Sequence, residues 1–246
     1  MTAADTRRAA KRYVVIDLAR ALALLGMISF HIAYDLEMFG WLRPGTASTG
    51  WFWYHARLTA GSFIFLAGLG LWLSHGKGIR WAAFWRRFVK IALAAALVSL
   101  ATYFAMPDVM IFYGILHSIA VSSLLGLAFL RLPWLVNLAI AAGVFALPYY
   151  YSDPSFGGIW VWSGLSGQAP LTADFEPIFP WFAPFLAGLA LGQILSRFAL
   201  WQRLEMVPGA FARALAWFGS RSLPIYLIHQ PVLIAVIAGL SYLLRS

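Results

Sequence analysis

The first long apolar stretch of the chain carries four side chains that could do chemistry: Asp17, Arg20, His31 and Asp35. Ionisable groups are costly inside a membrane span, so each indicates a function by default. On an α-helix, at 100° per residue, all four fall in one stripe on one face. Arg20 and His31 are then about 16 Å apart along the axis. This predicts a path with a cation at one end and, at the other, a titratable base backed by a carboxylate.

A structural explanation of the same residues stays open. Asp17 and Arg20 could be a neutralised pair at a membrane edge, and His31 with Asp35 an interfacial cap. Polar groups in three further apolar segments extend the candidate site, and of these His55 also fits an interfacial histidine among aromatic residues. They are His55 and Arg57 in the second segment, His117 in the fourth, and Tyr226, His229 and Gln230 in the last.

The elements that position these groups must be membrane helices. Apolar types make up 62% of the 246 residues and charged types 11%, against about 25% charged in soluble proteins. We therefore expect an all-α, polytopic membrane helix bundle, with residues 1–246 as one domain. The absence of cysteine excludes a disulfide framework, a thiolate metal site and a cysteine nucleophile. The net charge of +9 does not indicate nucleic acid, because the basic residues cluster between apolar stretches.

About seven segments are long and apolar enough to cross the bilayer. A tight helical hairpin is expected at 131–133, and the amphipathic stretch 198–220 is expected to lie along the membrane surface. Phe65-Leu66-Ala67-Gly68-Leu69 and Phe185-Leu186-Ala187-Gly188-Leu189 echo each other, as an internal repeat or a helix-packing pattern would. The predicted spans are 14–34, 55–74, 86–105, 110–130, 132–151, 177–197 and 222–244.

The charges between the spans predict the topology. Fourteen of the eighteen Lys and Arg fall in one alternating set of segments, which includes Arg7-Arg8 and Lys11-Arg12. Most acidic residues fall in the other set. The positive-inside rule then places the N-terminus in the cytoplasm, with an uncleaved first span. We expect an integral, multi-pass protein of the plasma (inner) membrane.

Four blocks of sequence carry a resemblance that covers about residues 12–235. They are Ile16-Asp17-Leu18-Ala19-Arg20-Ala21-Leu22-Ala23 with Met27, His31 and Asp35-Leu36; Phe63-Ile64-Phe65-Leu66-Ala67-Gly68; Tyr113-Gly114-Ile115-Leu116-His117; and Ser222-Leu223-x-Ile225-Tyr226-Leu227-Ile228-His229-Gln230-Pro231. Together they resemble the transmembrane acyltransferase superfamily, and within it the bacterial relatives of heparan-alpha-glucosaminide N-acetyltransferase.

The resemblance implies an enzyme that moves an acetyl (acyl) group from cytoplasmic acetyl-CoA to a sugar amine or hydroxyl at the outer side of the membrane, without a metal. Its partners would be acyl-CoA, an extracytoplasmic glycan or amino sugar and the lipid bilayer, with a homodimer left open. Arg20 would face the CoA phosphates. The catalytic histidine of the lysosomal branch corresponds to His55, and that of the polysaccharide O-acyltransferase branch to His31.

On this basis we expect His31 to act as general base on the acceptor, oriented by Asp35, with Arg57 or His117 stabilising the oxyanion. A covalent acetyl-histidine intermediate is the variant. The substrate-binding set is Asp17, Arg20, Arg57, Tyr226, His229 and Gln230. Three alternatives stay open: a proton-coupled transporter that uses the same polar stripe, a haem carrier ligated by His31 and His117, and a structural membrane subunit.

Overall fold

The computed structural model describes residues 13–245, which leaves Arg7, Arg8, Lys11 and Arg12 outside the described residues. Within this range the chain is helical and contains no β-strand. The membrane-length helices are α1 (Val14–Met38), α2 (Gly50–His75), α3 (Trp81–Ala105), α6 (Ile178–Arg197) and α8 (Ser222–Arg245), and the shorter ones are α4 (Ile115–Phe129), α5 (Trp134–Tyr150) and α7 (Ala210–Ser220).

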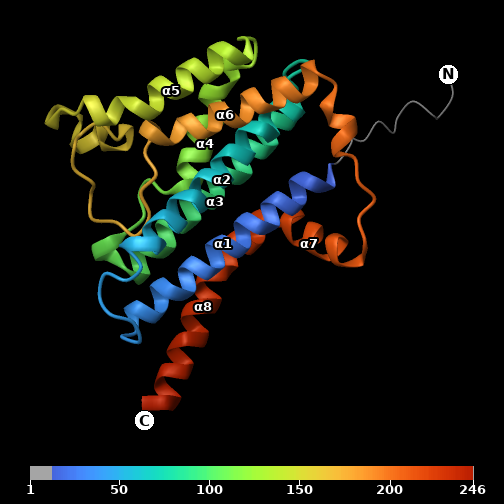
Figure 1. The fold of residues 1–246 in the computed structure, drawn as a ribbon. Helices are drawn as coiled ribbons and strands as arrows, with labels where there is room; N and C mark the ends of the chain where they lie inside the picture. The colour runs from blue at the N-terminus through green and yellow to red at the C-terminus, as the bar shows by residue number, and fades with distance from the viewer. Residues whose placement is uncertain (1–12, 246) are drawn as a thin grey trace.

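Helix α2 is the centre of the bundle, packing against α1, α4 and α6, while α5 lies on α6 and α3 on α4 (Figure 1). The core between them is fully buried at Ile64, Phe185 and Leu189. Helix α8 crosses α1 and continues beyond it, so its C-terminal part stands apart from the other helices. Side chains on that part, such as Val236 and Leu240, are exposed and apolar, as expected of a surface that faces lipid.

The two similar five-residue segments, 65–69 and 185–189, meet at the crossing of α2 and α6. A Cβ atom at Gly68 would collide with the carbonyl oxygen of Phe185, and one at Gly188 would collide with that of Phe65. The contact is therefore reciprocal, and glycine at both positions lets the two backbones touch. This close approach explains why the same string occurs in both helices.

Each of the seven predicted spans corresponds to one helix, with starts that differ by up to five residues. Five helices have the length and hydropathy of a membrane span, and α4 and α5 are shorter apolar helices. Helix α4 begins at Ile115 rather than at 110, because the residues before it pair with another segment, including a bridge between Tyr113 and Phe175. The tight turn at 131–133 is confirmed, since α4 ends at Phe129 and α5 begins at Trp134, but α5 then packs on α6 rather than back along α4.

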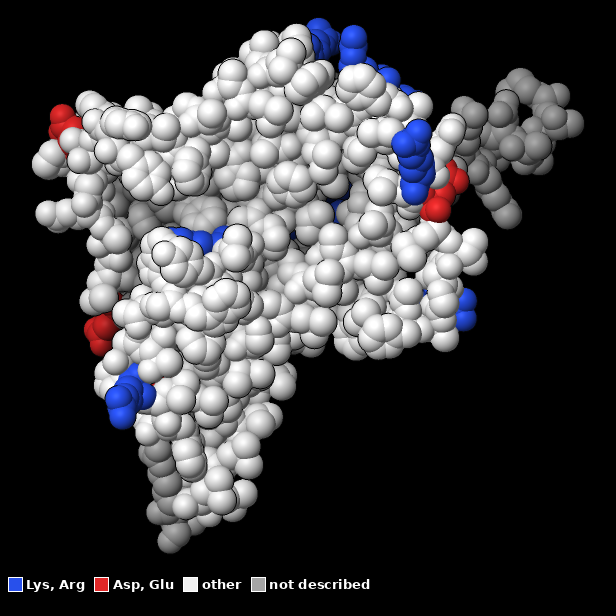
Figure 2. Space-filling view, in the orientation of Figure 1, with Lys and Arg blue, Asp and Glu red and all other residues white. Residues whose placement is uncertain are grey.

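The stretch 198–220 forms the short helix η4 (Leu200–Leu204) and α7. Helix α7 packs on the first turns of α1, where Gly219 lies against the carbonyl oxygen of Asp17. Most Lys and Arg seen in Figure 2 lie toward the end of the bundle where α1 begins and α6 ends, and the rest of that face is largely uncharged. The segregation is the one that the predicted topology requires.

Candidate active site

The polar stripe of α1 faces the inside of the bundle. Asp17 is 4% exposed and Asp35 is fully buried. Arg20 donates to Asp17 through Nη1 at 3.1 Å, which forms the expected ion pair. Arg20 and His31 each line a cavity, and the two cavities are different. The helix therefore presents its cation and its base to separate spaces.

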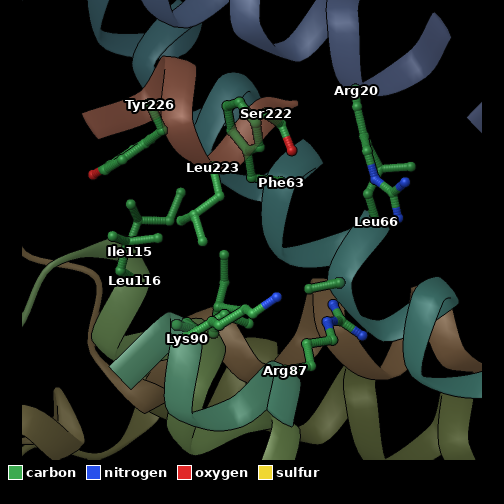
Figure 3. A pocket seen from close by; sticks show the side chains of 13 residues that line it. Arg20, Phe63, Leu66, Arg87, Lys90, Ile115, Leu116, Ser222, Leu223 and Tyr226 are labelled. Carbon is green, nitrogen blue, oxygen red and sulfur yellow. The ribbon is translucent and has the colours of Figure 1, made fainter. Parts of the chain in front are cut away.

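The first space, here called the basic cavity, has a volume of about 260 Å³. Three cations enter it from two helices: Arg20 from α1, and Arg87 and Lys90 from α3 (Figure 3). Its other walls are mainly apolar. The lining residues are Arg20, Phe63, Leu66, Ala67, Arg87, Lys90, Ile91, Ile115, Leu116, Ile119, Ser222, Leu223 and Tyr226.

A glycine of α2 makes room for the two guanidinium groups. A Cβ atom at Gly70 would lie 3.5 Å from Arg87 Nη1 and 3.6 Å from Arg20 Nη2. The side chains of Arg87 and Lys90 make no hydrogen bond or ion pair with any other residue from 13 to 245. Like charges held close together, of which only Arg20 has a carboxylate partner, are suited to a polyanion such as a phosphate group.

The second space, here called the histidine cavity, has a volume of about 90 Å³. It contains the groups that can move protons: His31 from α1, and Asp174 and Glu176 from the segment before α6. The lining residues are Met27, Phe30, His31, Ala56, Thr59, Ala60, Phe63, Ile115, Asp174, Glu176 and Tyr226.

Three side chains line both cavities and form the wall between them: Phe63 of α2, Ile115 of α4 and Tyr226 of α8. The Tyr226 hydroxyl points away from the three cations of the basic cavity (Figure 3). The wall is thus apolar except for one phenol, and it is contributed by three helices.

Residues 12–231 match the family model described as heparan-alpha-glucosaminide N-acetyltransferase, catalytic. The chain belongs to this family. It is thus a member of a membrane acetyltransferase family that uses acetyl-CoA as donor, which agrees with the bundle of apolar helices. Comparison with curated proteins and with solved structures gives no match.

The acetyltransferase fold brings His31 together with His229 of α8. Their ring centroids are 4.8 Å apart, with the rings edge to face. The Nδ1 of His229 donates to the carbonyl oxygen of Tyr226, because a carbonyl can only accept. Its Nε2 and the Nδ1 of His31 are both buried and have no hydrogen-bond partner among the described residues.

The expected hydrogen bond between Asp35 and His31 is not formed. Asp35 Oδ1 instead accepts from Gln230 Nε2 at 2.7 Å. Asp35 and His31 are one turn apart on α1, but the carboxylate is hydrogen-bonded to the Gln230 side chain of α8. Asp35 therefore joins α1 to the turn of α8 that carries His229.

The other candidates from α2 lie outside both cavities. His55 Nε2 is 2.9 Å from the carbonyl oxygen of Gly26 and 3.0 Å from Ser29 Oγ, so it joins α2 to α1. The guanidinium of Arg57 lies 3.6 Å from the ring centroid of Trp53 and is exposed. Between the two histidines that the resemblance leaves open, His31 lines one of the two cavities and His55 lines neither.

His117 also lies outside the cavities, at the beginning of α4. Its Nδ1 accepts from the backbone N–H of Gly114 at 3.3 Å, and its Nε2 lies 3.2 Å from Ser99 Oγ. Both ring nitrogens are thus engaged within the protein. Because His31 faces His229 instead, this arrangement does not support haem ligation by His31 and His117.

Four residues of the cavities were not predicted as site residues: Arg87, Lys90, Asp174 and Glu176. The sequence places them among the charges that determine topology, where they look like loop residues. A signal was present for Arg87 and Lys90, which are three residues apart and therefore share a helix face. For Asp174 and Glu176 the only signal is alternation, which puts both on the same side of an extended segment.

Proposed function

We propose that this protein is an acetyltransferase of the plasma (inner) membrane that moves an acetyl group from cytoplasmic acetyl-CoA to an amino sugar or a glycan at the outer side. Family membership supports acetyl transfer. The observation that carries the proposed path is the pair of cavities with one shared wall, basic on one side and proton-transferring on the other.

On the donor side, the phosphates of CoA meet Arg20, Arg87 and Lys90. Charge-assisted hydrogen bonds to phosphate are among the stronger ones in proteins, and arginine can make them in pairs. The volume of about 260 Å³ is below that of most sites for drug-sized ligands, roughly 300–1,000 Å³. The basic cavity therefore takes the narrow pantetheine arm and the diphosphate that joins it, while the adenosine stays at its mouth.

At the wall, the thioester carbonyl reaches Tyr226 and passes toward His31. His31 takes a proton from the acceptor as the acceptor attacks the thioester carbon, a step that typically contributes about 10²–10⁴-fold. The phenol of Tyr226 donates to the oxyanion that forms. This assigns the oxyanion contact to a residue of the wall rather than to Arg57 or His117, which lie outside both cavities.

The test is acetyl transfer by the purified full-length protein, with acetyl-CoA and a panel of amino sugars, scored as CoA release and acetylated product. We expect transfer to at least one amino sugar. In liposomes, acetyl-CoA supplied on the side of Arg20 should support acetylation of an acceptor enclosed on the side of His31. Movement of substrate across the liposome membrane without acetylation would contradict the proposal and favour the transporter.

A further inference from the structure

One side of the histidine cavity is acidic. It is formed by the segment 172–176, which runs beside the residues that precede α4. The backbone N–H of Ala173 donates to the Val109 carbonyl at 2.9 Å, and that of Glu176 to the Tyr113 carbonyl at 3.2 Å. Thr172 Oγ1 adds a third bond, to the Met110 carbonyl at 2.7 Å. The two carboxylates of this segment are therefore held in place before any substrate arrives.

The two carboxylates have different surroundings. Asp174 Oδ2 accepts from the N–H of Ile115 at 2.9 Å, at the positive N-terminal end of α4. A Cβ atom at Gly114 would collide with this oxygen, so glycine there is what admits the carboxylate. Glu176 Oε2 is buried and has no hydrogen-bond partner within residues 13–245. Asp174 thus serves the fold, whereas Glu176 has an unused acceptor in the cavity.

His31 brings a second unused group to the same cavity, because its Nδ1 is also buried without a partner. Leaving a buried polar atom unpaired costs about 1–3 kcal/mol. Two such atoms around one cavity indicate a ligand that interacts with both. An amine suits this pair, since it can donate N–H groups to both bases.

We propose that Glu176 is a second catalytic base, which takes the first proton from the ammonium group of the acceptor before His31 takes the other. This inference rests on the proposed function. An acceptor amine at neutral pH is mostly an ammonium ion, and it must lose two protons to become an amide. A hydroxyl acceptor loses only one, so it has no need of a second base.

The steps balance in atoms and charge. Glu176 removes one proton and leaves a neutral amine, whose nitrogen attacks the thioester carbon. A C–N bond forms, the carbonyl electrons move to oxygen, and their return breaks the C–S bond. His31 takes the second proton from nitrogen and passes it to the leaving CoA thiolate. The proton on Glu176 leaves to solvent, so each turnover releases one proton.

The charged and titratable groups around Glu176 favour this role. Burial and then the neighbouring Asp174 raise the pKa of Glu176 well above its usual value, while Arg57 of α2 lowers it. The cavity also places His31 of α1 and Tyr226 of α8 opposite this segment. A carboxylate with a raised pKa is a stronger base than an exposed one, and so is better matched to an ammonium ion.

The test is the pH dependence of kcat/KM for glucosamine in Glu176→Gln, beside Glu176→Asp and the exposed control Asp108→Asn. We expect Glu176→Gln to lose about 10²-fold at pH 6.5. The deficit should shrink as pH rises toward 9, because free amine then no longer needs the first base. Glu176→Asp should retain part of the activity, and Asp108→Asn should follow the wild type.

Two results would overturn the inference and leave the proposed function intact: unchanged kcat/KM in Glu176→Gln at every pH, or a loss of the same size at every pH, which indicates a structural role. Absence of acetyl transfer by the wild-type protein, with the whole panel of amino sugars, would instead overturn the proposed function itself.

Discussion

The basic cavity and the histidine cavity share a wall that includes the phenol of Tyr226, but they differ in their charged and imidazole groups. The first has three cations and no carboxylate or imidazole in its lining, so it can hold anions but cannot accept a proton at neutral pH. The second has an imidazole and two carboxylates in about a third of the space. Binding charge and proton-transfer groups are thus separated on the two sides of Phe63, Ile115 and Tyr226.

The largest effect is expected from His31→Ala, which removes the base from the histidine cavity and leaves the basic cavity intact. The rate of transfer should fall by about 10²–10⁴-fold, because general base catalysis contributes that much. Binding of acetyl-CoA, measured by calorimetry on the purified protein, should be nearly unchanged. Loss of acetyl-CoA binding in this variant would show that donor binding and proton transfer are not separated between the two cavities.

A smaller effect, on the KM for acetyl-CoA rather than on the rate of transfer, is expected from Arg87→Ala. The KM for acetyl-CoA should rise by about 10–100-fold, since a charge-assisted hydrogen bond contributes about 1.5–3 kcal/mol, while kcat changes much less. Arg86→Ala is the matched control, because Arg86 is one residue away on α3, exposed, and lines neither cavity. Equal KM values for the two variants would contradict the assignment of the basic cavity to the donor.

The stability of the fold should depend on pH through Asp174. Burial raises the pKa of Asp174 to about 6, against the opposing hydrogen bond from Ile115. A carboxyl whose pKa is raised by folding stabilises the folded state at low pH, and that contribution is lost as pH rises through about 6. Asp174→Asn stays neutral and keeps an acceptor for the Ile115 N–H.

The melting temperature of Asp174→Asn in detergent should therefore fall less between pH 5 and pH 8 than that of the wild type. A free-energy difference of 1 kcal/mol corresponds to about 2–4 °C for a chain of this size. Glu176 retains its own contribution, so part of the pH dependence remains. Identical slopes for the two proteins would show that Asp174 is not held in a buried setting.

The smallest effect is expected from the two histidines outside the cavities. His55→Gln and His117→Gln keep a hydrogen-bonding side chain, and we expect kcat/KM to stay within about threefold of the wild type, as for changes away from a site. The assay is the same CoA release. A loss of about 10²-fold or more in His55→Gln alone would identify His55 as the catalytic base and contradict the assignment of proton transfer to the histidine cavity.

Hydropathy predicts most of this fold because the bilayer fixes the length and the apolar character of each span. Hydropathy does not predict the start of α4, because Tyr113 pairs with Phe175, which lies more than sixty residues further along the sequence. The α1 stripe is predictable in the same way, because helical periodicity places Arg20 and His31 on one face without knowledge of the neighbours.

The partners of His31 and Asp35 in that stripe are not predictable from spacing alone. Asp35 is one turn from His31, yet it bonds to Gln230, because the packing of α8 on α1 decides which side chain reaches it. Arg87 and Glu176 read as topology charges for a related reason. A charge at the end of a span has the same sequence context whether it faces solvent or a cavity, and only tertiary packing separates the two cases.

The shared wall has a further consequence if the two cavities open to opposite sides of the membrane. An uninterrupted file of charged groups would conduct protons down the membrane potential, at about 2.3 kcal/mol per charge for each 100 mV. Phe63, Ile115 and the ring of Tyr226 interrupt that file with hydrocarbon. The same three side chains that a thioester must pass would thus act as electrical insulation between turnovers.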